Sequence, residues 1–201
     1  CKFGKFALNN LYYCKRIGDY HCSDQYLVDR MLPEKCLNMF HIFMILSGQL
    51  HIDYRVHSFI APAGSIVALD CRIPHRYYCT DHLNFVWLDI NGSATEAYFR
   101  PLTNHNVPLY TPSNFNEIVN RTLSIAREID EQTENEHNSS CFWHELFATL
   151  ANISETQDTS TKALITNVAI QYIKRNFAKK NYGEGASCAV QYQRVPFHPC
   201  V

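Results

Sequence analysis

One stretch decides the fold of this chain: Gly64-Ser65-Ile66-Val67-Ala68-Leu69-Asp70-Cys71-Arg72-Ile73-Pro74-His75-Arg76-Tyr77. It predicts an apolar strand that starts from a glycine turn, a polar corner closed by Pro74, and a second strand that begins with a histidine. Successive side chains of a strand point to opposite faces, so His75 and Tyr77 share one face and Arg76 lies on the other. If that face lines the inside of a barrel, it forms half of a small-molecule site.

The region around this stretch, residues 1–110, is rich in β-branched and aromatic residues broken by turn residues. Several short strands at close spacing are typical of a sandwich or a small barrel. The strands we expect are Tyr26 to Met31, Met39 to Leu46, Leu50 to Val56, Ser65 to Leu69, His75 to Cys79 and Phe85 to Ile90.

Beyond Pro112 the pattern changes to apolar residues at three- and four-residue steps, which is typical of amphipathic helices. We expect helices at Phe115–Ile129, Cys141–Ile153 and Ala163–Ala178, with a polar connection over 154–161. The expected organisation is a barrel over 1–110, a helical segment over 111–155, a linker with one further helix over 156–180, and an irregular tail over 181–201.

Composition limits the function classes. The 201 residues are 46% hydrophobic and 13% aromatic with a net charge of −1, and no basic stripe suggests a duplex-binding surface. The nine cysteines contain no Cys-x-x-Cys pair, so we interpret most of them as free thiols of a cytoplasmic protein. No signal peptide and no membrane-spanning run is visible, and we expect no membrane partner.

Three segments carry a resemblance to a known family: Phe40–Leu50, with its strand-turn-strand pattern, Gly64–Tyr77, and Phe85–Gly92. Together they resemble the cupin barrel and, more closely, the N-terminal effector-binding domain of AraC-family bacterial transcription regulators. The second cupin motif places Gly and His eleven positions apart, as Gly64 and His75 are here, but Asp70 and Arg72 replace its internal Pro and Gly. The resemblance implies a mainly β fold, a double-stranded β-helix or jelly-roll barrel followed by two or three helices.

Metal-binding cupins use an earlier His-x-His pair and a Glu. Counting back from Gly48 puts His41 at the Glu position, and non-histidine pairs at the His positions: Lys35 with Leu37, or Glu34 with Cys36. Catalytic metal sites need at least three converging ligands, and these motifs offer only His41 and His75. We therefore expect no metal and no cofactor, and a metal-dependent cupin enzyme is the alternative to a sensor.

The remaining interpretation is a binding cavity for a small polar, sugar-like molecule, since aromatic walls with directed donors suit such a ligand. In arabinose-responsive regulators the positions that match His75, Tyr77 and Trp87 face the effector, and Arg30 matches an arginine that contacts it. Strand alternation adds Phe85 beside Trp87, and His41 on its own strand. The candidate ligand-binding residues are His75, Tyr77, Trp87, Phe85, His41 and Arg30.

Each candidate also has a structural interpretation. His75 and His41 could be core histidines satisfied within the chain, Tyr77 and Trp87 could be ordinary barrel packing, and Arg30 could be a surface or ion-paired arginine. No nucleophile elbow, phosphate-binding glycine loop or His-Glu-x-x-His motif suggests an enzyme.

The family resemblance also implies that the helices pair two subunits and that a domain with two helix-turn-helix units follows. Leu123, Ala126, Leu146 and Leu150 are the expected dimer contacts, although the same apolar stripes would serve helices that only cover the barrel. Only 24 residues follow Phe177, so we expect DNA binding to depend on a domain that is not complete in this chain. Three classes stay open: an effector sensor that forms a homodimer, a cupin enzyme, and a purely structural dimerisation module.

Overall fold

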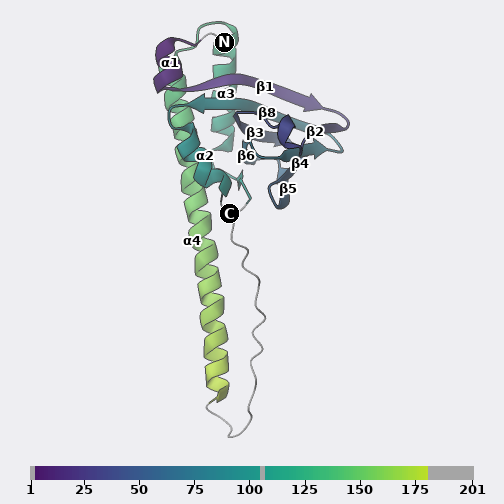
Figure 1. Ribbon diagram of the computed structural model, residues 1–201, viewed down its shortest axis with the longest axis vertical. Coiled ribbons are helices and arrows are strands. Elements are labelled where there is room, and N and C mark those ends of the chain that lie inside the picture. The colour runs from purple at the N-terminus through teal and green to yellow at the C-terminus, as the bar shows by residue number, and fades with distance from the viewer. Residues whose placement is uncertain (1–2, 105–106, 181–201) are drawn as a thin grey trace. The chain divides into compact units, whose positions relative to one another are not determined.

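The computed structural model describes residues 3–104 and 107–180 (Figure 1). Contacts divide the chain into two units, Cys1–Asp158 and Thr159–Val201, and all of the strands belong to the first. The expected irregular tail over 181–201 lies outside the described residues. The elements are α1 (Lys5–Asn10), β1 (Tyr12–Cys22), β2 (Tyr26–Arg30), a 3-10 turn (Pro33–Lys35), β3 (Phe40–Ser47), β4 (Gln49–Tyr54), β5 (His57–Pro62), β6 (Ile66–Asp70), β7 (His75–Cys79), β8 (Leu83–Gly92), α2 (Thr95–Asn104), β9 (Leu109–Tyr110), α3 (Phe115–Asp130) and α4 (Glu136–Lys180).

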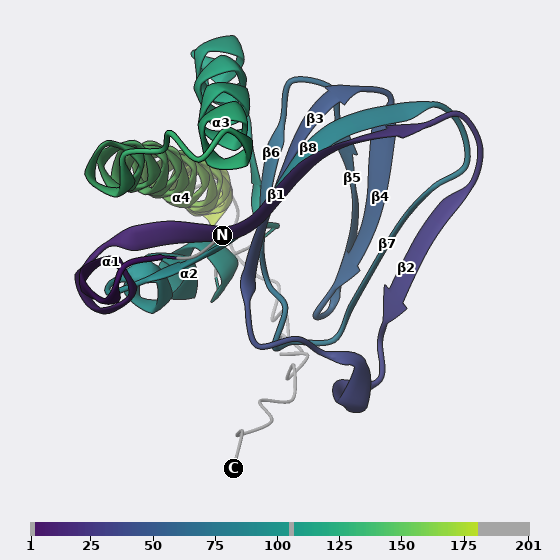
Figure 2. The same ribbon diagram turned by 90° about the horizontal axis from the view of Figure 1, so that it is seen from above.

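The strands form two antiparallel sheets that face each other. One has the order β1-β8-β3-β6-β9 and the other the order β2-β7-β4-β5. Figure 2 shows α1, α2, α3 and the first part of α4 (residues 136–158) gathered on the outer side of the first sheet, while the second sheet lies across the barrel from it. The expected fold class, a mainly β jelly roll followed by helices, is confirmed.

The inner strands of the first sheet are buried on both faces, because they supply two cores at once. From Phe40 to Ile45 every residue of β3 is buried. Alternation sends Ile42 and Met44 toward the helices and Phe43 and Ile45 into the barrel. In β8 alternate residues face opposite sides, as the sequence predicts. Those that pack against the helices are Val86, Leu88 and Ile90. Those that face the barrel are Leu83, Phe85 and Trp87.

The helices cover this sheet with large apolar side chains, Trp143 and Phe147 among them, which are fully buried. Leu146 and Leu150 lie in the same core, 1% and 0% exposed. Since they have almost no surface left for a second subunit, we correct their assignment from dimer contacts to core residues. Leu123 and Ala126 are partly exposed on α3, and for them a dimer contact stays a prediction.

At the corner between β6 and β7, Asp70 and Arg72 stand in place of the proline and glycine of the cupin motif, and their contacts hold the turn. The Asp70 carboxylate accepts hydrogen bonds from the backbone N–H of Arg72 at 3.1 Å and from its Nη2 at 2.8 Å. The guanidinium also lies over the ring of Phe40, 4.7 Å from its centroid. An ion pair and an aspartate-capped turn therefore shape this corner.

Several features differ from the sequence-based expectation, and helix α1 and strands β5 and β9 are among the elements that were not expected. Strand β1 was not expected, because polar residues such as Lys15 and Asp19 interrupt its apolar pattern. Helix α2 forms although it contains Pro101. Helix α4 continues through 154–161, where a polar connection was expected, because residues that are polar on every side are compatible with an exposed helix.

Among the described residues, no helix combines the length and the apolar character that crossing a bilayer requires.

Candidate ligand-binding site

A pocket of about 280 Å³ lies between the two sheets, inside the barrel. All six residues proposed from the sequence line it: Arg30, His41, His75, Tyr77, Phe85 and Trp87. The structure adds eight further lining residues: Arg16, Tyr20, Tyr26, Val28, Leu37, Met39, Phe43 and Cys71. The structure thus brings every candidate together, and ligand binding by them stays a prediction.

The pairing of strands explains why these side chains converge. In the second sheet Arg30 lies opposite His75, with β2 antiparallel to β7. In the first sheet Phe43 lies opposite Trp87. Positions directly opposite in an antiparallel pair point to the same face, so each pairing places two side chains on the inner face.

Rings make up most of the wall. The imidazole of His41 is parallel to the indole of Trp87, with centroids 5.6 Å apart and planes 5° apart. His75 and Tyr77 stack in the same way, 6.1 Å and 6° apart. Gly18 makes room for Trp87, because a Cβ at Gly18 would lie 3.1 Å from the indole Nε1. These flat faces suit the apolar side of a sugar-like ring.

Beneath the rings, Asp89 joins three neighbouring strands. This fully buried carboxylate accepts from Nε of Arg16 at 2.6 Å and from Nδ1 of His41 at 2.6 Å. Burial acts to raise the pKa of Asp89, but the hydrogen bonds from His41 and Arg16 and the charge of Arg16 outweigh it and hold the pKa below its usual value. Both carboxylate oxygens are therefore engaged and ionised.

A β-bulge turns Arg16 toward this carboxylate. The register of β1 against β8 shifts between Cys14 and Arg16, with Lys15 as the extra residue. Before the bulge Cys14 faces the helical core, whereas after it Ile17 takes that side and Arg16 faces the barrel. Bulges commonly re-aim a side chain next to a site in this way.

The two histidines of the pocket differ in how they are satisfied. Nδ1 of His75 donates to the carbonyl of Ile73 at 2.8 Å, so the core interpretation and the pocket interpretation both hold for His75. Nδ1 of His41 donates to Asp89, but its Nε2 is buried and has no hydrogen-bond partner among the described residues. His41 therefore keeps one polar atom for another molecule.

The pKa of His75 gives a pH prediction. Burial, together with the nearby charge of Arg30, lowers its pKa below the usual 6.5, against the opposing hydrogen bond to Ile73. Near pH 6.5 the imidazole of His75 therefore binds a proton more readily in the unfolded chain than in the folded chain. The free energy of unfolding falls as the pH drops through 6.5. We expect His75→Asn, which keeps a donor near the Nδ1 position, to reduce this loss, by at most about 1.4 kcal/mol per pH unit. Urea unfolding of the unmodified chain and of His75→Asn at pH 7.5 and 5.5 measures the difference. An equal loss of stability between the two pH values in both proteins would contradict the prediction.

Sequence reasoning missed Asp89 and Arg16 as site residues. A signal for Asp89 was available: it shares the inward parity of Phe85 and Trp87 on a strand that is buried on both sides. No local signal indicated Arg16, because its direction depends on the bulge.

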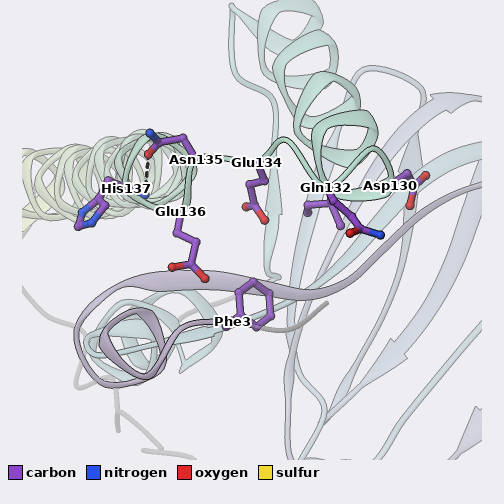
Figure 3. A pocket seen from close by; sticks show the side chains of 8 residues that line it. Phe3, Asp130, Gln132, Glu134, Asn135, Glu136 and His137 are labelled. Carbon is purple, nitrogen blue, oxygen red and sulfur yellow. Dashed lines mark hydrogen bonds between the residues drawn. The ribbon is translucent and has the colours of Figure 1, made fainter.

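A second hollow, of about 870 Å³, lies where α3 leads into α4 (Figure 3). Its lining includes Phe3, Glu134 and Glu136, and two of its polar side chains already bond to the chain's own backbone. Glu136 accepts from the N–H of Gly4 at 2.8 Å, and Asn135 caps α4 by accepting from the N–H of His137 at 3.1 Å. We therefore assign the site to the barrel pocket.

The described residues contain no group of three His, Cys, Asp or Glu side chains placed to hold a metal ion. Leu37, at one of the positions where a metal-binding cupin has histidine, is an apolar part of the pocket wall.

Comparison with known proteins gives matches among solved structures only. No family model matches the chain, and no curated protein matches it by sequence. The AraC-like transcriptional activator CuxR is 12% identical with a TM-score of 0.51, over 67% of this chain and 51% of CuxR. ToxT from Vibrio cholerae O395 is 16% identical with a TM-score of 0.45, over 68% of this chain and 54% of ToxT. A cupin-2 domain containing protein from Shewanella frigidimarina NCIMB 400 is 13% identical with a TM-score of 0.30, over 42% of this chain and 72% of that protein.

The matched region is about half the length of CuxR and of ToxT. At 12% identity the likeness to CuxR shows the fold alone. The chain has a jelly-roll barrel with following helices, similar in fold to CuxR over 67% of this chain.

Proposed function

We propose that this chain is the ligand-sensing part of a transcription regulator of the AraC type, and that its barrel binds a small, polar, sugar-like effector. One observation carries the proposal: side chains from β1, β2, β3, β7 and β8 converge on a pocket of about 280 Å³ with flat aromatic walls. One of these side chains, His41, has a buried Nε2 without a hydrogen-bond partner among the described residues. Pockets with apolar walls and a few placed polar groups are typical of small-molecule sites. The likeness to CuxR, an AraC-like transcriptional activator, supports the regulatory half of the proposal.

In this proposal the chain is a cytoplasmic protein that catalyses no reaction and needs no cofactor. Effector binding changes how two copies pair, with the partly exposed Leu123 and Ala126 of α3 at the contact. Binding also changes how a helix-turn-helix domain meets DNA, because a ligand shifts an equilibrium toward the state that it binds better.

A thermal-shift screen against sugars, glycosides and small aromatic acids tests the proposal. A ligand that binds only the folded chain raises its melting temperature, by about 5 °C or more at a hundred times Kd. We expect one chemical class to do so and the others to leave the melting temperature unchanged.

Two variants on β2 make the screen specific to the pocket. Val28 lines the pocket, while Leu27 beside it is 61% exposed on the outer face. Val28→Phe fills the cavity and should abolish the ligand shift, whereas Leu27→Phe adds the same ring outside and should keep it. A shift that survives Val28→Phe, or no shift with any class, would contradict ligand sensing in this pocket.

A further inference from the structure

The barrel pocket offers a ligand positive charge without matching negative charge. Its lining includes the guanidinium groups of Arg16 and Arg30, and none of the described residues that line it is Asp or Glu. The charge of Arg16 is already matched by the buried carboxylate of Asp89. For Arg30 the described part of the chain shows no ion pair, only a hydrogen bond from Nη1 to the carbonyl of Lys35 at 3.0 Å. The charge of Arg30 is therefore left for a ligand.

Arg30 is placed to bind an anion inside the barrel. It ends β2 opposite His75, and its charge lies close enough to lower the pKa of that imidazole further, beyond the larger effect of burial. One hydrogen bond to Lys35 leaves four of the five guanidinium N–H groups. A planar guanidinium binds a carboxylate through two parallel N–H···O bonds, which is its strongest common pairing.

His41 supplies the second requirement, a hydrogen-bond acceptor. Its side chain is 10% exposed, and its Nδ1–H donates to Asp89 at 2.6 Å, which fixes the ring with Nε2 on the opposite edge. With the ring proton on Nδ1, Nε2 of the neutral imidazole is a hydrogen-bond acceptor. Leaving a buried polar atom unpaired is unfavourable, and a ligand hydroxyl that donates to Nε2 would remove that cost.

We infer that the effector is a sugar acid, a small polyhydroxy carboxylate whose carboxylate binds Arg30 and whose hydroxyl donates to Nε2 of His41. The inference rests on the proposed function, because it names the ligand class of the same pocket. Trp87 and Tyr77 flank the imidazole with centroids 5.6 and 6.4 Å from it, and they offer flat faces to the C–H side of a sugar ring. The volume of about 280 Å³ suits a molecule of monosaccharide size.

Calorimetric titration of the full chain with matched probes tests the two contacts separately. D-Glucuronate, D-galacturonate and D-gluconate carry both groups, D-glucose and D-galactose lack the carboxylate, and cyclohexanecarboxylate lacks the hydroxyls. We expect at least one sugar acid to bind about tenfold or more tightly than its neutral parent and than cyclohexanecarboxylate.

Substitutions test which residues cause the preference for the sugar acid over the two control ligands. Arg30→Gln should bring the sugar acid and its parent sugar to similar affinity. The control Arg76→Gln removes a guanidinium that pairs with Asp53 on the outer face of β7, and it should leave the preference intact. His41→Phe should bring the sugar acid and cyclohexanecarboxylate to similar affinity. If His41→Phe does not fold, the same two probes on the unmodified chain decide the hydroxyl contact.

The outcomes separate this inference from the proposed function. Neutral sugars that bind as tightly as their acids would overturn the sugar-acid inference and leave a sensor of neutral sugars. Cyclohexanecarboxylate that binds as tightly as the acids would overturn the hydroxyl contact. A ligand of another class that is blocked by Val28→Phe would overturn the inference alone, whereas no ligand from any class would overturn both.

Discussion

Asp89→Ala should destabilise the folded chain by about 3 kcal/mol, which corresponds to a fall in melting temperature of roughly 6–12 °C for a unit of this size. The Asp89 carboxylate is fully buried and receives hydrogen bonds at 2.6 Å from Arg16 and 2.6 Å from His41. Its removal leaves the second nitrogen of a buried imidazole unpaired and frees a guanidinium from β1. Urea unfolding at pH 7 measures the change.

Two further variants show whether charge and burial cause this loss. Asp89→Asn keeps an acceptor for His41 but loses the charge, so it should cost less than Asp89→Ala. Asp53→Ala is the matched control, because Asp53 also pairs with an arginine, Arg76, on the outer face, where an ion pair contributes about 1 kcal/mol or less. Equal losses for Asp53→Ala and Asp89→Ala would contradict the buried role.

The effect of Asp89 should also depend on pH in a definite direction. Because the folded pKa lies below the usual 3.8, the stabilisation is present above pH 4 and is lost as pH falls through the folded pKa. The difference between the unmodified chain and Asp89→Ala should therefore shrink in strong acid.

Gly48→Ala should destabilise the chain by more than about 3 kcal/mol, the sum of backbone strain and a collision. Gly48 turns the chain from β3 to β4 with φ +78°, and a Cβ there would lie 2.1 Å from the carbonyl oxygen of His82. That oxygen belongs to the backbone, so relief requires the turn or the start of β8 to move. Thermal unfolding and the yield of folded protein measure the effect.

Gly64→Ala provides the comparison, because the two glycines share one conformation and differ in their surroundings. Gly64 has φ +83°, but a Cβ added there meets nothing within 4 Å. We expect it to cost only the strain of a left-handed alanine, about 1–2 kcal/mol. A loss at Gly64 equal to that at Gly48 would show that the close approach of His82 contributes nothing.

The local parts of the site could be predicted from the sequence. Strand alternation predicted that Tyr77 shares a face with His75 and that Phe85 shares a face with Trp87, because the period of two needs no knowledge of the partner strand. The family resemblance identified these faces as the ones that look into the barrel. The family resemblance added Arg30, which no periodicity could have selected. All of these side chains line the pocket.

The non-local parts could not be predicted. Arg16 and Asp89 are 73 positions apart, and they meet because a bulge turns β1 by one residue. The burial of Leu146 and Leu150 depends on which surface covers the helix, and an apolar stripe fits a sheet or a second subunit equally well. The sequence over 154–161 is polar, and such a sequence is compatible with a connection as well as with a helix. The continuity of α4 could therefore not be predicted.

Because β8 carries pocket residues on one side and helix-packing residues on the other, the two sides cannot move independently. Trp87 stands in the pocket wall, and its chain neighbours Val86 and Leu88 lie in the core beneath the helices. A close-packed interior transmits small displacements, since it has few voids to absorb them. A ligand that displaced Trp87 together with its backbone would therefore also displace Val86 and Leu88, so we expect the sheet to link the pocket mechanically to the helices.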